Sequence, residues 1–280
     1  MDLKERLHTH LIEIVRDRDP YLNTAGHFFV QQYIRQQLEQ WGTLETHEFK
    51  VQGKTHHNLI LNIPPLGKER VPPILIGAHY DAVPGTPGAD DNATGVAALL
   101  EFARAFAIEP LKKYPVRLVA FDMEEYGMVG SSHYAAELKQ QQQPLRLMLS
   151  LEMLGYCDST PGSQRYPAGL ERFYPNRGNF IGLIGNLLTI PDLIRLRRNI
   201  RKTGTPSEWL PAPNRGVIVP QTRLSDHAPF WDRGYRAIMV TDTAFMRNPN
   251  YHKSTDTIES LDLDFLCGVC RGLESGIRRL

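Results

Sequence analysis

Apolar residues recur at helical spacing near both ends of the chain. In residues 2–17, four of them fall on one stripe: Leu3, Leu7, Leu11 and Ile14. This spacing predicts an amphipathic helix, and similar patterns predict helices over residues 24–41 and 260–278. We therefore expect residues 1–42 to form two helices that pack on the rest of the protein.

Between these helices, short apolar runs alternate with further helical patterns. The runs predict strands over residues 44–51, 57–64, 72–79, 114–124, 145–154, 216–220 and 237–242. The intervening helices are predicted over residues 93–106, 130–141 and 187–204. The first run alternates polar and apolar residues like an exposed edge strand, whereas the later runs are nearly all apolar. This pattern predicts an α/β fold: a mixed, mostly parallel twisted sheet between two layers of helices.

The composition is that of an ordinary globular protein and limits the partners. Neither a repeat nor a linker divides the 280 residues, so we expect a single domain over residues 1–280. With 22% charged residues and a net charge of +1, there is no electrostatic case for a nucleic-acid partner or an acidic membrane. No run approaches 18 apolar residues, the length expected of a transmembrane helix. The charged start of the chain lacks a signal-peptide core, so we expect a cytoplasmic protein. The sequence leaves the oligomeric state open.

The three cysteines, Cys157, Cys267 and Cys270, are too few for a disulfide framework. Cys267 and Cys270 have the spacing of a redox or metal motif, but they lie in an amphipathic segment with no second pair. We expect them to be small buried residues of a helix.

Acidic residues and histidines follow several of the apolar runs. In sheets of this class, ligands bind beyond the carboxyl ends of the strands, so these residues are the candidates for chemistry. They are His79 with Asp81, Asp90 with Asp91, Glu124 with Glu125, and Glu152 with the later His252. Taken singly, each has an ordinary alternative: an acidic turn, a helix cap or a loop histidine.

Together, these residues suit a metal site. Asp81 follows His79 by two positions and can accept its second ring N–H, an arrangement typical of metal-ligating histidines. The adjacent Glu124 and Glu125 repel each other unless positive charge lies between them. Two imidazoles and several carboxylates favour a pair of zinc ions over calcium or a thiolate-bound structural zinc.

Six motifs resemble metallopeptidase family 28, the co-catalytic zinc aminopeptidases, a group that includes glutamate carboxypeptidase II-like enzymes and glutaminyl cyclases. They are "HYD", "GADDNATG", "FDMEEYGMVGS", "LEMLGY", "SDHAPF" and "YHKSTDT", and they span about residues 55–280. The resemblance implies the zinc-aminopeptidase fold, a three-layer αβα architecture with a phosphorylase/hydrolase-like sheet. It also implies a di-zinc exopeptidase that cleaves the first bond of a peptide or amino-acyl amide.

The resemblance also implies a role for each motif residue. The implied metal ligands are His79 and Glu152 on one zinc, Glu125 and His252 on the other, and Asp91 between both. The remaining roles are Asp81 orienting His79, Glu124 as general base, a cis Asp91–Asn92 peptide bond, a structural Asp90, and Asp226 and His227 in the cleft without ligating. Many family members carry aspartate where this chain has Glu152, whose longer side chain can still ligate.

Three alternatives share part of this pattern. A glutaminyl cyclase-like acyltransferase would keep a single zinc. A related amidohydrolase or carboxypeptidase would act on a non-peptide amide, but only about 100 residues separate Glu152 from His252, little room for the lid domain usual there. An inactive binding protein would typically have lost ligands. Side-chain specificity is not readable, although the loop-rich segments 156–180 and 204–224 are expected to shape the cleft.

Overall fold

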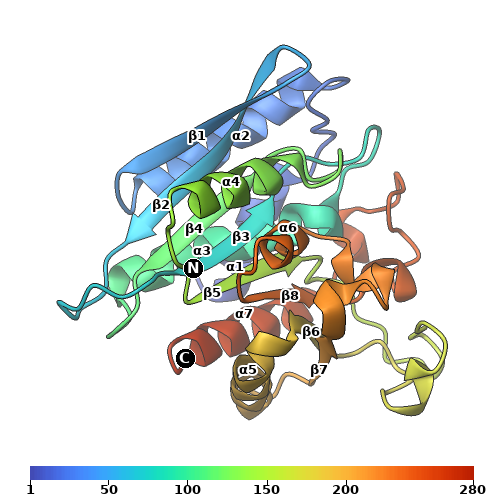
Figure 1. Cartoon of the computed structure of the whole chain (residues 1–280). Coiled ribbons are helices and arrows are strands. Elements are labelled where there is room, and N and C mark those ends of the chain that lie inside the picture. Colours follow the sequence, from blue (N-terminus) through green and yellow to red (C-terminus); the bar gives the residue numbers. More distant parts are fainter.

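Eight strands form one mixed sheet through the middle of the molecule (Figure 1). The computed structural model describes all 280 residues. The strands are β1 (Leu44–Val51), β2 (Lys54–Ile63), β3 (Ile74–His79), β4 (Val116–Phe121), β5 (Leu147–Glu152), β6 (Ile181–Asn186), β7 (Ser207–Ala212) and β8 (Ala237–Thr241). Their order across the sheet is β1-β2-β4-β3-β5-β8-β6-β7. The central strands β4, β3, β5 and β8 are parallel, and antiparallel pairing joins β1 to β2, β2 to β4 and β6 to β8.

Helices cover both faces of this sheet (Figure 1). They are α1 (Leu3–Ile14), α2 (Thr24–Glu39), α3 (Gly95–Ile108), α4 (Val129–Gln140), α5 (Ile190–Lys202), α6 (His227–Asp232) and α7 (Leu263–Ile277). None of them combines the length and apolarity that crossing a bilayer requires. In β3, Ile74 and Ile76 join the apolar cluster that contains α1, α2, α3, α5 and α7, whereas Leu75 joins the cluster that contains α4 and α6. The predicted three-layer α/β fold is confirmed.

The N-terminal helix α1 begins at a capping box. Asp2 accepts the N–H of Glu5, and the Glu5 side chain accepts the N–H of Asp2. Leu7, Leu11 and Ile14 are fully buried on the face that meets α3 and α7. The two helices predicted at the start of the chain are therefore present, each two or three residues shorter at its end than the pattern suggested.

The C-terminal helix α7 carries Cys267 and Cys270 on its buried face, as predicted. All three cysteines are free thiols. Burial raises the pKa of Cys270 well above its usual value, which keeps that thiol protonated and unreactive.

The strand predicted at residues 216–220 is wrong. Val217 and Ile218 are 60% and 67% exposed and belong to no strand. Asn214 and Arg215, just before them, have positive φ angles of 47° and 54°, so the backbone turns instead of extending. The apolar run in this short loop has the sequence pattern of a strand, but no neighbouring strand pairs with it.

Two strands and one short helix were missed: β6, β7 and α6. Gly182 and Gly185 lower the β propensity of β6, and Pro211 in β7 is tolerated because β7 lies at the edge of the sheet. The segment 204–224, expected to be loop-rich, therefore contains a strand. The segment 156–180 is irregular as expected, apart from an isolated bridge and one short 3-10 turn.

Candidate metal centre

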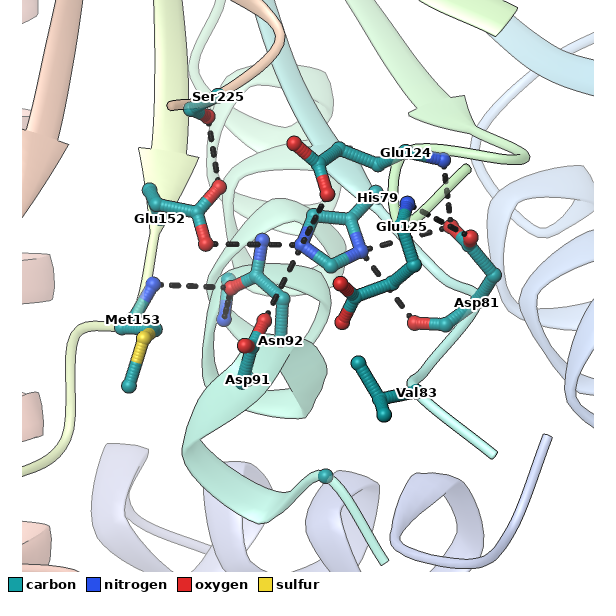
Figure 2. A network of polar contacts seen from close by, with 12 residues as sticks. His79, Asp81, Val83, Asp91, Asn92, Glu124, Glu125, Glu152, Met153 and Ser225 are labelled. Carbon is teal, nitrogen blue, oxygen red and sulfur yellow. Dashed lines mark hydrogen bonds and ion pairs between the residues drawn. The ribbon is translucent and has the colours of Figure 1, made fainter. Parts of the chain in front are cut away.

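The carboxyl ends of three neighbouring parallel strands bring the predicted residues together. His79 is the last residue of β3, Glu152 is the last residue of β5, and Glu124 and Glu125 follow β4. Asp91 comes from the turn that leads into α3. Figure 2 shows their side chains pointing toward one another at this edge of the sheet, where ligands bind in folds of this class.

Asp91 lies between two histidines. Its Oδ1 is 3.3 Å from Nε2 of His79, and its Oδ2 is 3.1 Å from Nε2 of His252. Glu152 adds an oxygen 3.5 Å from Nε2 of His79, and Glu125 adds an oxygen 3.4 Å from Nε2 of His252. The five residues thus form two clusters that share Asp91, and the ligand atoms within each cluster lie within 4.8 Å of one another.

The carboxylates of this site are buried and lie close together, so bound positive charge would stabilise them. Burial, with the charge of Asp91, raises the pKa of Glu125 to about 7, and burial raises the pKa of Glu124 well above its usual value. Burial lowers the pKa of His252, but contacts with Asp91 and Glu125 outweigh it and raise the pKa to about 10. Nε2 of His79 and Oε1 of Glu125 are buried without a hydrogen-bond partner. Divalent cations satisfy such atoms, and a donor set of nitrogen and oxygen suits zinc.

Asp81 supports the site at two places (Figure 2). Its carboxylate oxygens accept the N–H groups of Glu124 and Glu125 at 3.0 and 3.1 Å. Nδ1 of His79 lies 3.3 Å from the Asp81 carbonyl oxygen and 3.5 Å from its Oδ1. Asp81 therefore contacts the His79 ring, where an orienting acid is expected, and also holds the turn that carries both glutamates. The second contact was not foreseen.

Arg18 is a supporting residue that sequence reasoning missed. Its guanidinium is fully buried and donates to the carbonyl oxygens of Tyr80, Pro87 and Gly88 at 2.8, 2.6 and 2.8 Å. It also reaches the carbonyl of Asp91 at 3.3 Å. Burial lowers the pKa of Arg18, and the charges of Asp91 and other nearby carboxylates oppose that shift. In the sequence, Arg18 stands among charged residues between two helices and resembles a solvated turn.

Two further carboxylates make hydrogen bonds that hold the loop carrying Asp91. Asp256 accepts the N–H groups of Asp90 and Asp91 at 2.9 and 3.1 Å, another contact that was not predicted. Asp90 accepts a main-chain N–H at 2.9 Å and the amide of Asn248 at 2.7 Å, in keeping with a structural role. The Asp91–Asn92 peptide bond is cis, as the resemblance implies.

Asp226 and His227 were expected to lie in the active-site cleft without ligating, and both are fully buried in the structure. Burial raises the pKa of Asp226 to about 7, opposed by the nearby His79, and neither of its oxygens has a hydrogen-bond partner. His227 is directed into the core, where its ring meets Trp231 edge-on at 4.3 Å and its Nε2 lies 2.8 Å from the carbonyl oxygen of Thr222. Burial lowers the pKa of His227 to about 3. Only Asp226 therefore approaches the metal-ligand cluster.

A mostly apolar cleft of about 830 Å³, including its open mouth, adjoins the cluster. Glu152 and Tyr251 line it at the metal side, and the Tyr251 ring stacks on His252 at 3.7 Å. The segments 156–180 and 204–224 both contribute to its lining. The cleft therefore opens directly beside the residues that could hold metal ions.

Comparisons with known proteins agree with this geometry. The model of peptidase family M28 matches residues 58–183. The uncharacterized protein YfbL of Escherichia coli K12 is 35% identical over 257 residues, which is 86% of this chain and 77% of that protein. The structure of the LapA aminopeptidase of Legionella pneumophila matches with a TM-score of 0.74 at 20% identity, over 99% of this chain and 71% of that one. BSAP, a zinc aminopeptidase from Bacillus subtilis, matches with a TM-score of 0.62 at 25% identity, over 81% of this chain and 51% of that one.

The matched span and the site coincide. Every predicted ligand except His252 lies inside residues 58–183. The likeness to YfbL extends over most of both chains, and the likeness to LapA shows that the same fold covers nearly the whole of this one. The chain therefore belongs to peptidase family M28, as its motifs indicated.

Proposed function

We propose that the protein is an aminopeptidase that holds two zinc ions and hydrolyses the first bond of peptides or amino-acyl amides. The observation that carries this proposal is the position of Asp91. Its two oxygens face two different histidine nitrogens, and one glutamate completes each cluster. Co-catalytic hydrolases use such a pair of sites joined by a shared ligand.

His79, Asp91 and Glu152 would hold one ion, and Asp91, Glu125 and His252 would hold the other. When bound, the two ions would supply Lewis acidity to the scissile carbonyl and lower the pKa of the attacking water toward neutrality. The chain's own contribution is to fix the ligands, and it does so through Asp81, Arg18 and Asp256 rather than through the ligands alone.

We assign the general base to Glu124. Its Oε2 lies 3.9 Å from Nε2 of His79. Glu124 could also join His79 and Glu125 in a ligand group, but neither of the two clusters that share Asp91 needs it for completion. Its main-chain N–H is held by Asp81, which fixes the backbone from which the carboxylate extends toward His79. Glu124 would take the proton of the attacking water and then deliver it to the leaving amine.

The cleft beside Glu152 would receive the side chain of the substrate's first residue. Names of relatives support an action on amino termini. YwaD of Bacillus subtilis, 40% identical over 83 residues, is named an aminopeptidase, although the match covers only 29% of this chain and 18% of that protein. BSAP is described as a zinc aminopeptidase.

The test combines metal analysis with substrates. The purified protein, loaded with zinc and desalted, is expected to retain two zinc ions per chain by mass spectrometry of the metal. It should then release arylamine from aminoacyl arylamides, lose this activity with a chelator and leave N-acetylated substrates uncut. One ion per chain, together with ring closure of an N-terminal glutamine peptide, would instead identify a cyclase. Hydrolysis that is insensitive to chelation would contradict the proposal.

A further inference from the structure

The floor of the cleft is one face of the strands β8, β6 and β7. Pairing sets Thr241 beside Gly182 and Gly182 beside Glu208. Two residues further along, it sets Met239 beside Ile184 and Ile184 beside Leu210. Because alternate residues of a strand share a face, these six residues lie on the same face of the sheet, and all six line the cleft.

Glu208 is the one charged residue among these six. Apart from Glu152, which belongs to the metal-ligand cluster, it is the only acidic residue of the lining. Each of its oxygens already has a cationic partner from α5. Nη2 of Arg197 lies 3.1 Å from Oε2, and Nη2 of Arg201 lies 2.5 Å from Oε1.

Both arginines are held in place. Their Nε atoms donate to the carbonyl oxygen of Ser207 at 3.1 and 3.0 Å. Neither arginine lines the cleft, so both approach Glu208 from outside it. Glu208 thus lines the cleft with its negative charge balanced by two guanidinium groups that lie outside the cleft.

We infer that the cleft selects substrates whose first side chain is large and uncharged, and that Arg197 and Arg201 enforce this choice by masking Glu208. This inference rests on the proposed function. An apolar or aromatic side chain gains from burial against this lining. A lysine or arginine side chain would be desolvated without an unpaired carboxylate, and an acidic side chain would be desolvated without a cationic residue in the lining.

The masking predicts a specific change of preference. Zinc-loaded wild-type protein should have kcat/KM values for leucyl and phenylalanyl arylamides at least tenfold above those for lysyl and glutamyl arylamides. In the variant with Arg197→Met and Arg201→Met, the ratio of lysyl to leucyl kcat/KM should rise at least tenfold, because Glu208 is then free to pair with the substrate. Adding Glu208→Gln to that variant should remove the gain.

The control is Glu208→Gln alone, which should keep the wild-type preference. If the double variant unfolds, Arg201→Met alone, with Arg197 retained, should give a smaller shift in the same direction. A lysyl-to-leucyl ratio that stays unchanged in a folded arginine variant would overturn the inference. So would a wild-type protein that cleaves lysyl and leucyl substrates equally well.

Binding of free amino acids separates this inference from the proposed function. Calorimetric titration of the zinc-loaded protein with leucine, phenylalanine and lysine needs no turnover. Selective binding of leucine and phenylalanine without any hydrolysis would refute the proposed function and leave the inference standing. Hydrolysis without a preference among side chains would do the reverse.

Discussion

At the residue scale, Asp81 contacts both the turn that carries the two glutamates and the ring of His79. One carboxylate accepts two N–H groups, from Glu124 and Glu125, and the same residue contacts the ring of His79. The end of β3 and the turn after β4 are therefore joined through a single residue. A change at Asp81 should disturb the proposed base and two proposed ligands together, so its effects will be larger than those of any single hydrogen bond.

Substituting Glu124 and Asp91 should separate catalysis from metal binding. Glu124→Gln keeps the shape and the Asp81 contact of the main chain, so it should retain zinc while kcat falls by about 10²–10⁴-fold. Asp91→Ala removes the oxygens that face both histidines and should lose zinc as well. Zinc content and kcat are measured on the same samples. Full activity of Glu124→Gln would contradict the assignment of the base.

Arg18→Met should weaken zinc binding without touching a ligand. The substitution removes the donors that hold the loop carrying Asp91 and removes a buried cation near the ligand carboxylates. By analogy with other residues that support ligands, we expect zinc affinity to fall about 10–100-fold, measured by competition with a chelator. Arg18→Lys keeps the charge but loses the fork of donors, so it should recover only part of the affinity. Wild-type affinity in both variants would refute this role.

The sequence predicted the residues whose side chains face one another in the site. It missed residues whose side chains contact main-chain atoms of the site. His79, Glu125 and Glu152 follow apolar runs, so the strand pattern located them, and the structure brings them together. Arg18 and Asp256 contact main-chain atoms of the ligand loop, and no residue type or spacing marks such a contact. Their roles depend on where distant segments meet in the folded protein.

At the scale of elements, the helix α1 is joined to α3 by both apolar packing and an ion pair. Arg6 of α1 donates from Nε to both oxygens of Glu101 in α3, at 3.0 and 2.9 Å. The Glu101 side chain is nearly buried, and Arg104 adds a third contact at 3.2 Å. The position of the first helix therefore depends on the charge of Glu101.

This contact predicts a loss of stability in acid. Burial raises the pKa of Glu101, but hydrogen bonds from His10 and Arg6 outweigh it and lower the pKa from 4.5 to about 2. Since the folded-state pKa is the lower one, the stabilisation is complete above pH 4.5 and disappears as pH falls from 4.5 to 2. Its upper limit is about 3 kcal/mol.

The measurement is urea unfolding with chelator present, so that release of zinc does not contribute. Glu101→Gln should lower the free energy of unfolding at pH 6 and approach wild type near pH 2. Glu109→Gln is the matched control, because Glu109 is also paired with an arginine but is largely exposed. A pH-independent difference between wild type and Glu101→Gln would count against the ion pair.

Element prediction succeeded where periodicity and burial agreed. The amphipathic α1 and the apolar β3 and β5 matched their patterns closely because their environments are uniform. The pattern failed toward the far end of the sheet. There, β6 carries two glycines, β7 carries a proline, and Val217 and Ile218 lie exposed in a loop. These elements depend on their neighbours in the sheet rather than on their own residues.

At the scale of the whole molecule, metal binding should stabilise the fold. The proposed ligands come from β3, β5, the turn after β4, the turn before α3 and the loop around His252, so bound zinc would link segments far apart in the sequence. Zinc at one hundred times the Kd of one site should add about 2.7 kcal/mol for that site and raise Tm by about 4–10 °C, and filling both sites at this excess should roughly double the gain. Scanning calorimetry with zinc and with chelator tests this. An unchanged Tm for wild type, with Asp91→Ala as the control, would count against a metal centre.

Because Arg18 is buried beneath the site, the part of the chain needed to form the site begins before the segment that the family model matches. The family model matches from residue 58 onward, yet a guanidinium forty positions earlier lies beneath the loop that carries Asp91. A shortened version starting at β1 would keep every proposed ligand and still lack the cation under them. Engineers who trim or exchange the leading pair of helices should expect to uncover the apolar core that these helices bury and also to lose the cation under the centre, and should retain that single arginine first.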